Sequence, residues 1–155
     1  MIADSAFELV YNRQADRVYR ISFVILKNRE DALDISQTVF MRYLNNHPVF
    51  HDDDHESAWF IHVTQNACKD MIKHWWRKKR KDTDLSLIAQ PENRSLLEEL
   101  MNLPEKHRTV LYYTYYEGYT SKELAILLNT NESTIRSRLV KARDGLRKEL
   151  TDEEP

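Results

Sequence analysis

Two stretches of this chain gather positive charge beside groups suited to nucleic acid. The first, Lys69 to Lys81, has a net charge of +6 and contains the run Lys73-His74-Trp75-Trp76-Arg77. Unpaired bases need flat rings beside cations, because a ring stacks on the base while Lys or Arg contacts the backbone. The stretch therefore indicates a single-strand binding surface. The alternative stays open that Trp59 and one of Trp75 or Trp76 belong to a core and the cations only solvate a helix end.

The second stretch, residues 132 to 150, has a net charge of +3 and the spacing of an amphipathic helix. Its polar side carries hydroxyls and cations, namely Ser133, Thr134, Arg136, Ser137, Arg138 and Lys141. Small hydroxyls near the start of a helix reach phosphates and base edges, and arginine can donate two hydrogen bonds to guanine. This pattern favours duplex DNA binding over a merely solvated basic face.

A third cluster contains side chains that can bind metal, in the segment from His47 to His55. It has no HExxH, CxxC or EF-hand spacing, and consecutive aspartates in a loop usually face water. The chain also lacks the phosphate-binding and nucleophile-elbow motifs GxxxxGK[ST], GxGxxG and GxSxG. We therefore expect no catalytic residues, no metal and no cofactor, and a protein that is not an enzyme.

The composition predicts an all-α fold. The 155 residues are 41% hydrophobic, enough for packed cores, and include only two glycines, too few for a sheet with frequent turns. Cys68 is the single cysteine, and no apolar run is long enough to span a membrane. We expect a cytoplasmic protein without membrane insertion. The net charge of −2 means that any DNA binding depends on where the charges lie.

The chain divides at a segment that loses helical periodicity. Residues 81–93, KDTDLSLIAQPEN, mix Asp, Thr, Ser and Pro and predict a linker. The expected organisation is two small helical domains, residues 1–80 and 94–150.

The first domain is predicted to hold three helices. Phe7, Tyr11, Val18 and Ile25 fall on one face of the first helix. Asn28 is placed to cap a second helix over about residues 29–46. A polar loop is expected from 47 to 56, and Ser57 is expected to cap a long third helix.

The second domain is predicted to contain a helix-turn-helix. A first helix covers about 95–102, and Pro104 suits the first position of the next, which Gly118 can end. Thr120 and Glu123 form a capping box before a short helix. Residues 129–131 form the turn, and Asn131 can cap the final basic helix.

Four segments in this order resemble a bacterial RNA polymerase sigma factor of the extracytoplasmic-function group, which keeps only the second and fourth conserved regions. They are Asp31 to Arg42, Ala58-Trp59-Phe60 with Asn66 and Asp70, Leu103 to Arg108, and Glu132 to Arg138. The resemblance runs from about Phe7 to Leu150. It implies a transcription initiation factor that binds core RNA polymerase, directs it to promoter DNA and assists strand opening.

The resemblance also implies roles for particular residues. Residues 1–80 would bind polymerase and melt the minus-ten element, and residues 94–150 would read the minus-thirty-five element. Polymerase binding falls to Asp31, Asp34 and Gln37. Minus-ten binding falls to Asn66, Asp70, Lys73, Trp76, Arg77, Lys78 and Arg80, together with the loop from His47 to Glu56. Minus-thirty-five binding falls to Ser133, Thr134, Arg136, Ser137, Arg138 and Lys141. An inhibitory anti-sigma factor is a further implied partner.

Two other functions remain as alternatives at this point. One is a helix-turn-helix regulator that binds duplex DNA by itself, as a dimer, which leaves the paired tryptophans and the acidic second helix unexplained. The other is a metal-dependent hydrolase centred on His51 to His55, which leaves the second domain without a purpose.

Overall fold

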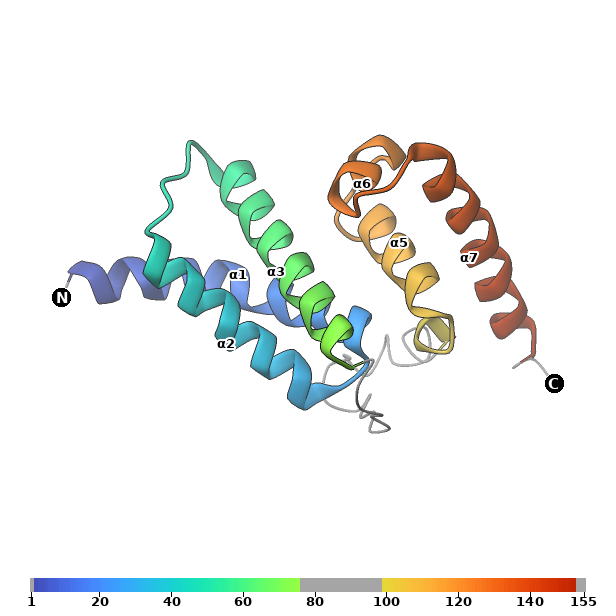
Figure 1. The fold of residues 1–155 in the computed structure, drawn as a ribbon, viewed down its shortest axis with the longest axis horizontal. Coiled ribbons are helices and arrows are strands. Elements are labelled where there is room, and N and C mark those ends of the chain that lie inside the picture. The colour runs from blue at the N-terminus through green and yellow to red at the C-terminus, as the bar shows by residue number, and fades with distance from the viewer. Residues whose placement is uncertain (1, 76–98, 153–155) are drawn as a thin grey trace. The chain divides into compact units, whose positions relative to one another are not determined.

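The structure is a computed structural model that describes residues 2–75 and 99–152. It divides into two compact units, Met1–Asp82 and Thr83–Pro155. Each unit is built from helices, and the described part of the chain contains no strand (Figure 1). The prediction of an all-α protein with two helical domains is confirmed. The expected linker, residues 81–93, lies outside the described residues, as does the segment 95–98 of the helix expected around 95–102; Glu99–Met101 are helical.

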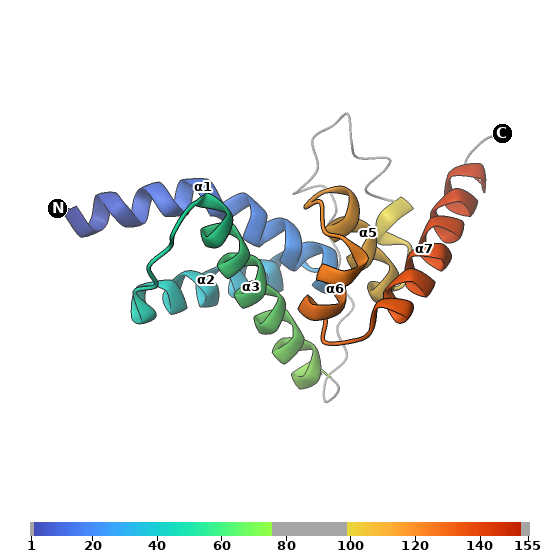
Figure 2. The ribbon, with the colours of Figure 1, turned by 90° about the horizontal axis from the view of Figure 1, so that it is seen from above.

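The first unit packs three helices, α1 (Ile2–Leu26), α2 (Arg29–Asn46) and α3 (Asp53–Trp75), each against the other two (Figures 1 and 2). Their inner faces bury apolar side chains such as Val18, Phe23, Val39 and Phe60. Burying each of these side chains stabilises the fold by about 1.5–3 kcal/mol before conformational entropy is counted. Tyr11 remains exposed, so the predicted inner face of α1 is buried only over its later turns.

The second helix begins and ends as its residues predict. The side chain of Asn28 accepts a hydrogen bond from the backbone amide of Asp31 at 2.9 Å, which satisfies one of the free amides of the first turn. The helix ends where His47 adopts the left-handed conformation, with φ of 47°. The predicted span of about 29–46 is confirmed.

The predicted start of the third helix is wrong. α3 begins at Asp53, so the loop covers 47–52 rather than 47–56, and Ser57 lies inside the helix. Asp52 precedes the first turn, and its carboxylate accepts a hydrogen bond from the backbone amide of His55 at 2.8 Å. Farther along this helix, Cys68 is fully buried.

The second unit packs α5 (Glu105–Tyr115), α6 (Ser121–Leu127) and α7 (Glu132–Asp152) together. Tyr113, Leu124 and Ile135 are among its largest fully buried side chains, one from each helix. Pro104 immediately precedes α5 instead of occupying its first helical position. Gly118 adopts φ of 78° after α5, a left-handed conformation that glycine adopts without strain. At Gly145 a β-carbon would lie 2.9 Å from Cδ2 of Leu103, so α7 approaches the segment before α5 closely.

The helix-turn-helix expected between residues 120 and 150 is present. Thr120 and Glu123 exchange hydrogen bonds as a capping box at the start of α6. These bonds lower the pKa of the Glu123 carboxyl. Asn131 accepts a hydrogen bond from the backbone amide of Thr134 at 2.8 Å and so caps α7. No helix within the described ranges 2–75 and 99–152 is long and apolar enough to cross a membrane.

Candidate nucleic-acid and partner-binding faces

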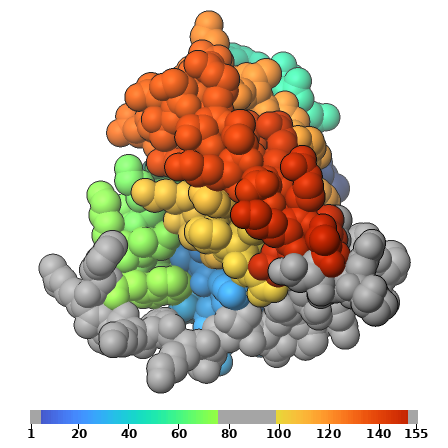
Figure 3. Space-filling model, turned by 90° about the vertical axis from the view of Figure 1, so that its right-hand side faces the viewer, coloured from blue at the N-terminus to red at the C-terminus, as the bar shows by residue number. Residues whose placement is uncertain are grey.

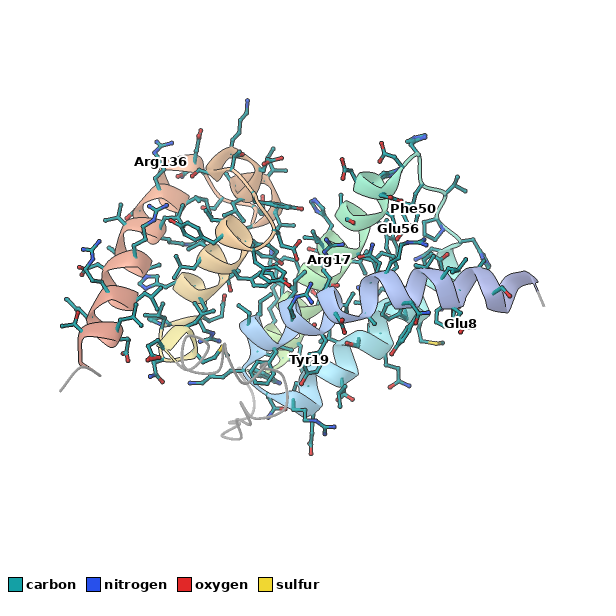
Figure 4. The ribbon with its side chains drawn as sticks, turned by 180° about the vertical axis from the view of Figure 1, so that it is seen from behind. Glu8, Arg17, Tyr19, Phe50, Glu56 and Arg136 are labelled. Carbon is teal, nitrogen blue, oxygen red and sulfur yellow. The ribbon has the colours of Figure 1, made fainter. Side chains whose placement is uncertain are left out.

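A buried carboxylate fixes the beginning of α3 against α1. Arg13 donates two hydrogen bonds to Glu56, from Nε at 2.9 Å and from Nη2 at 2.7 Å, and Gln14 Nε2 donates a third at 2.9 Å. Arg17 joins the same group by donating to Ser57 Oγ at 2.8 Å, and Figure 4 shows Arg17 and Glu56 between the two helices. We call Arg13, Gln14, Arg17, Glu56 and Ser57 the α1–α3 network.

Charge explains why Glu56 tolerates burial. The hydrogen bonds from Arg13 hold the pKa of the Glu56 carboxyl below its usual range, against the opposing effect of burial. The same contact raises the pKa of Arg13. A bidentate arginine–carboxylate pair is both stronger and more directional than a neutral hydrogen bond. The network therefore holds the first turn of α3, and with it the end of the preceding loop, against α1.

The loop 47–52 is held on its other side by aromatic packing. The Phe50 ring lies 6.5 Å from that of Tyr43, 6.0 Å from Trp59 and 5.4 Å from His55, measured between ring centres. Its neighbour Val49 is 83% exposed. The loop is thus anchored by Phe50, which Figure 4 places beside the start of α3, while Val49 faces solvent.

The outer face of α3 carries the described part of the expected minus-ten set. Asn66, Asp70 and Lys73 are exposed and follow one another at spacings of four and three, which places them on one side of the helix. The other expected residues, Trp76, Arg77, Lys78 and Arg80, lie outside the described residues. The loop 47–52 leads directly into α3, so the loop and this face of the helix are neighbours in the chain.

The exposed face of α2 combines acidic, amide and apolar side chains. Asp34 and Gln37 are exposed, and so are the large apolar residues Leu33, Met41 and Leu44. We call these five residues the α2 face. Asp31 departs from the expectation that it lies there too, because its side chain is 2% exposed. The rotation of α2 against its neighbours turns Asp31 toward the interior of the unit, beside the buried Ala32 and Ile35.

The exposed side of α7 carries the residues expected to read DNA. Arg136, Ser137 and Lys141 are exposed, and Arg138 and Thr134 are half-buried. Ser133 is exposed as well, and its hydroxyl donates to Asn131 Oδ1 at 2.7 Å. Arg136 lies 3.4 Å from the Glu132 carboxylate, an exposed pair that rearranges at little cost. Figure 3 shows α7 on the surface of its unit, and Figure 4 shows Arg136 pointing outward near its start.

Positive charge on α7 also reaches His107 on α5. Burial lowers the pKa of His107, and the nearby charges of Lys141 and Arg138 lower it further. The next residue, Arg108, is buried and donates to the backbone oxygen of Leu103 at 2.9 Å. Within the Leu103 to Arg108 motif, the arginine is therefore part of the interior of the unit.

Sequence reasoning missed two groups of polar contacts. One is the α1–α3 network, which joins the two helices through residues 40 or more positions apart, so no local sequence pattern predicts it. The other is a contact between Arg143 of α7 and Tyr115 of α5, at 2.7 Å between Nε and the hydroxyl oxygen. Arg143 belongs to the basic helix, and its spacing could have placed it among the candidate DNA-binding residues. Nothing in the sequence around Tyr115 indicates its contact with Arg143.

The histidine and aspartate cluster does not form a metal site. Among the described residues, no three His, Cys, Asp or Glu side chains are placed to hold a metal ion. The rings of His51 and His55 stack, with centres 4.9 Å apart, and His55 Nδ1 accepts a hydrogen bond from the backbone amide of His51. These contacts stabilise the loop on which the metal-dependent hydrolase alternative was centred.

Comparison with known proteins agrees with the family resemblance seen in the sequence, over most of the chain. The family profile described as sigma-70 region 2 matches residues 10–80, and sigma-70 region 4 matches residues 93–145. The ECF RNA polymerase sigma factor SigW of Bacillus subtilis is 26% identical, over 95% of this chain and 90% of its own length. SigX of the same organism is 25% identical, over 97% and 90%.

A solved structure shares the fold. The sigma factor RpoE from Bartonella quintana, crystallised in complex with the anti-sigma factor NepR, matches with a TM-score of 0.72 and 15% identity, over 97% of this chain and 98% of that one. Two family regions in order, relatives matched over most of their length and this fold agree with the resemblance found in the four sequence motifs. The chain belongs to the sigma-70 family of transcription initiation factors, in its extracytoplasmic-function group.

Proposed function

We propose that this chain binds core RNA polymerase through the α2 face and carries it to promoters whose two elements it contacts with separate domains. The observation that carries the proposal is the composition of that face. Exposed Leu33, Met41 and Leu44 lie there with the acidic Asp34. Acidic side chains repel phosphates, and grouped exposed apolar residues are typical of protein interfaces. The first unit therefore needs a protein partner as well as DNA.

This composition also separates the proposal from the remaining alternative. A regulator that binds duplex DNA alone needs only the helix-turn-helix and a dimer contact. It leaves the α2 face and the exposed row Asn66, Asp70 and Lys73 without a role. A polymerase subunit uses both. In the proposed division, Asp34 and Gln37 contact polymerase, and Asp31 supports the start of α2 from inside.

The domains divide the promoter between them in this proposal. Residues 1–80 melt and hold the minus-ten element with the loop 47–52, with Asn66, Asp70 and Lys73, and with the basic residues that follow α3. Residues 94–150 bind the minus-thirty-five element through Ser133, Thr134, Arg136, Ser137, Arg138 and Lys141. Residues 81–93 connect the two. Two weak contacts on one polymerase act multivalently, so neither domain alone needs to bind tightly.

The remaining parts of the proposal concern the setting. The chain acts in the cytoplasm, performs no chemistry itself, and lowers the cost of strand opening by stacking and gripping unpaired bases. It is held inactive by an anti-sigma factor. This last step is supported by the complex in which the structurally similar Bartonella protein was crystallised.

Charge reversal on the α2 face tests the proposal. We expect Asp34→Lys to weaken association with core polymerase at least about tenfold, because a like charge placed in an interface costs several kcal/mol. Co-purification and competition with the unlabelled wild-type chain measure it. Asp16→Lys is the matched control, since Asp16 is an exposed acid on α1 outside the α2 face.

Two outcomes would contradict the proposal. One is wild-type association by Asp34→Lys in a chain whose helical signal is intact. The other is failure of the wild-type chain to associate with core polymerase under any condition in which it is folded. Reconstituted transcription on a genomic DNA library would then identify the promoters that the complex selects.

A further inference from the structure

Tyr115, the last residue of α5, contacts Arg143 of α7. Arg143 Nε donates a hydrogen bond to the Tyr115 hydroxyl oxygen at 2.7 Å, and the guanidinium carbon lies 5.6 Å from the centre of the tyrosine ring. Both side chains are exposed, and Tyr115 is 65% so. Among the described residues, this tyrosine is the polar partner that the structure gives to the Arg143 guanidinium. The terminal nitrogens of Arg143 and the proton of the Tyr115 hydroxyl are left for a ligand.

The position of Arg143 on α7 indicates which ligand this is. Arg136, Val140 and Arg143 follow one another at spacings of four and three, so they share one side of the helix, and all three are exposed. Arg143 therefore continues the side on which Arg136 lies, about 10 Å farther along the axis at 1.5 Å per residue. A duplex that meets the start of α7 presents phosphates next to that side.

The surrounding charges favour an anion as well. Asp144 is adjacent in sequence, but its carboxylate lies 3.4 Å from the Lys148 ammonium group. Glu132, at the start of the same side, lies 3.4 Å from Arg136. The carboxylates of this stretch thus have cationic partners of their own, and Arg143 keeps its charge for an outside group. An arginine and a hydroxyl converging on one point are typical donors to a DNA phosphate.

We propose that Tyr115 and Arg143 together bind one backbone phosphate of the duplex, so that α5 contributes directly to DNA binding. Arg143 provides the charge through its terminal nitrogens. Tyr115 accepts from Nε, which holds the guanidinium in place, and donates its own hydroxyl proton to the same phosphate. Holding a long side chain in its bound arrangement removes part of the entropy lost on binding. The inference rests on the proposed DNA-binding role of α7.

The test compares salt dependence among variants of the full chain. The probe is a fluorescent mixed-sequence duplex of about 20 base pairs, long enough for two turns of DNA, titrated by anisotropy at several KCl concentrations. A phosphate clamp is independent of base sequence, so this probe suffices. Thermal unfolding followed by circular dichroism verifies that each variant is folded.

Removing the charge and removing the hydroxyl have different expected effects. Arg143→Gln should make the slope of log K against log salt shallower by about 0.9, the value for one phosphate contact. Tyr115→Phe should raise the Kd about tenfold or more, as expected for a hydrogen bond to a charged group, with an unchanged slope. In the Arg143→Gln background, Tyr115→Phe should add less than about a twofold change, because both act on one phosphate.

Tyr116→Phe is the matched control. Tyr116 is exposed and follows Tyr115 immediately after α5, and its ring stacks on Tyr112, so this variant should bind as the wild type does. The inference is overturned if Tyr115→Phe binds like the wild type, if the two substitutions act independently, or if the wild-type chain has no affinity for the duplex. Polymerase is absent from this assay, so these results leave the outcome of the Asp34→Lys experiment separate.

Discussion

The starts of α3 and α7 are positioned in different ways, although both helices carry residues proposed to bind DNA. The start of α3 is tied to α1 by the α1–α3 network, whose partners are 40 or more positions apart in the chain. Each helix also has a local cap, because Asp52 accepts a hydrogen bond from the His55 amide and Asn131 accepts one from the Thr134 amide, three residues ahead in both cases. Hydrogen bonds to another helix form only when the unit is packed, whereas a local cap needs only its own helix.

The largest effect expected from this comparison is at Glu56. Glu56→Ala should lower the free energy of unfolding of the first unit by about 2–3 kcal/mol, because Arg13 and Gln14 lose their shared acceptor. Urea unfolding followed by tryptophan fluorescence measures it selectively, since all three tryptophans, at 59, 75 and 76, belong to this unit.

Asp54 provides the control for that measurement. It is an exposed acid in the same first turn of α3, so Asp54→Ala should change the free energy of unfolding by no more than about 0.5 kcal/mol. Equal effects of the two substitutions would show that the network adds nothing beyond the general preference for acids at a helix start.

A smaller effect is expected at the start of α7. Asn131→Ala should destabilise the second unit by about 1 kcal/mol, because the Thr134 amide loses its acceptor. The tryptophan signal of the first unit should not change. Urea titrations followed by amide resonances of each unit provide the measurement.

Asn129→Gly controls for the turn itself. Asn129 has φ of 54°, which glycine adopts readily, so this substitution should be close to neutral. If Asn131→Ala proves as harmless as Asn129→Gly, the contrast between a local cap and a long-range tie fails at α7.

The smallest expected effect is a pH dependence of stability that differs between the two units. His107 is the only histidine after Lys81, and its lowered pKa means that the unfolded chain binds the proton more readily. The second unit should therefore be fully stabilised above the ordinary histidine pKa of about 6.5 and lose stability as the pH falls below it. The same amide resonances measure this, and His107→Gln should flatten the dependence.

The first unit should respond to more acidic conditions. The Glu56 pKa is lowered in the folded chain, so its contribution is complete above the ordinary glutamate pKa of about 4.3 and is lost as the pH falls through the lower, folded value. Tryptophan fluorescence follows it, with Glu56→Gln as the comparison. Loss of both units over the same pH range would contradict the two assignments.

The same contrast explains how much of the fold could be read from the sequence. Asn28, Thr120 with Glu123, and Asn131 act on amides three residues away, so their types and spacing were enough to predict three helix starts. Ser57 has the residue type of a cap, yet its hydroxyl binds Arg17 of another helix. Asp31 was assigned to polymerase binding from its motif and is buried, because the rotation of α2 against its neighbours is decided by packing.

The candidate site follows the same rule. The exposed sides of α3 and α7 follow from helical periodicity, and Asn66, Asp70, Lys73, Arg136 and Lys141 are exposed as that periodicity indicates. Their roles came from a resemblance to a family, which no count of charges supplies. Tyr115 could not be found from sequence, because its meaning depends on Arg143, 28 positions away.

The single cysteine allows local unfolding of the first unit to be measured by thiol modification. Cys68 is fully buried on α3, so its thiol reacts with an alkylating reagent only when that helix leaves its neighbours. The rate of modification then measures how often the unit opens transiently. No label has to be engineered, and protection upon adding core polymerase or DNA would reveal directly which ligand tightens this half of the molecule.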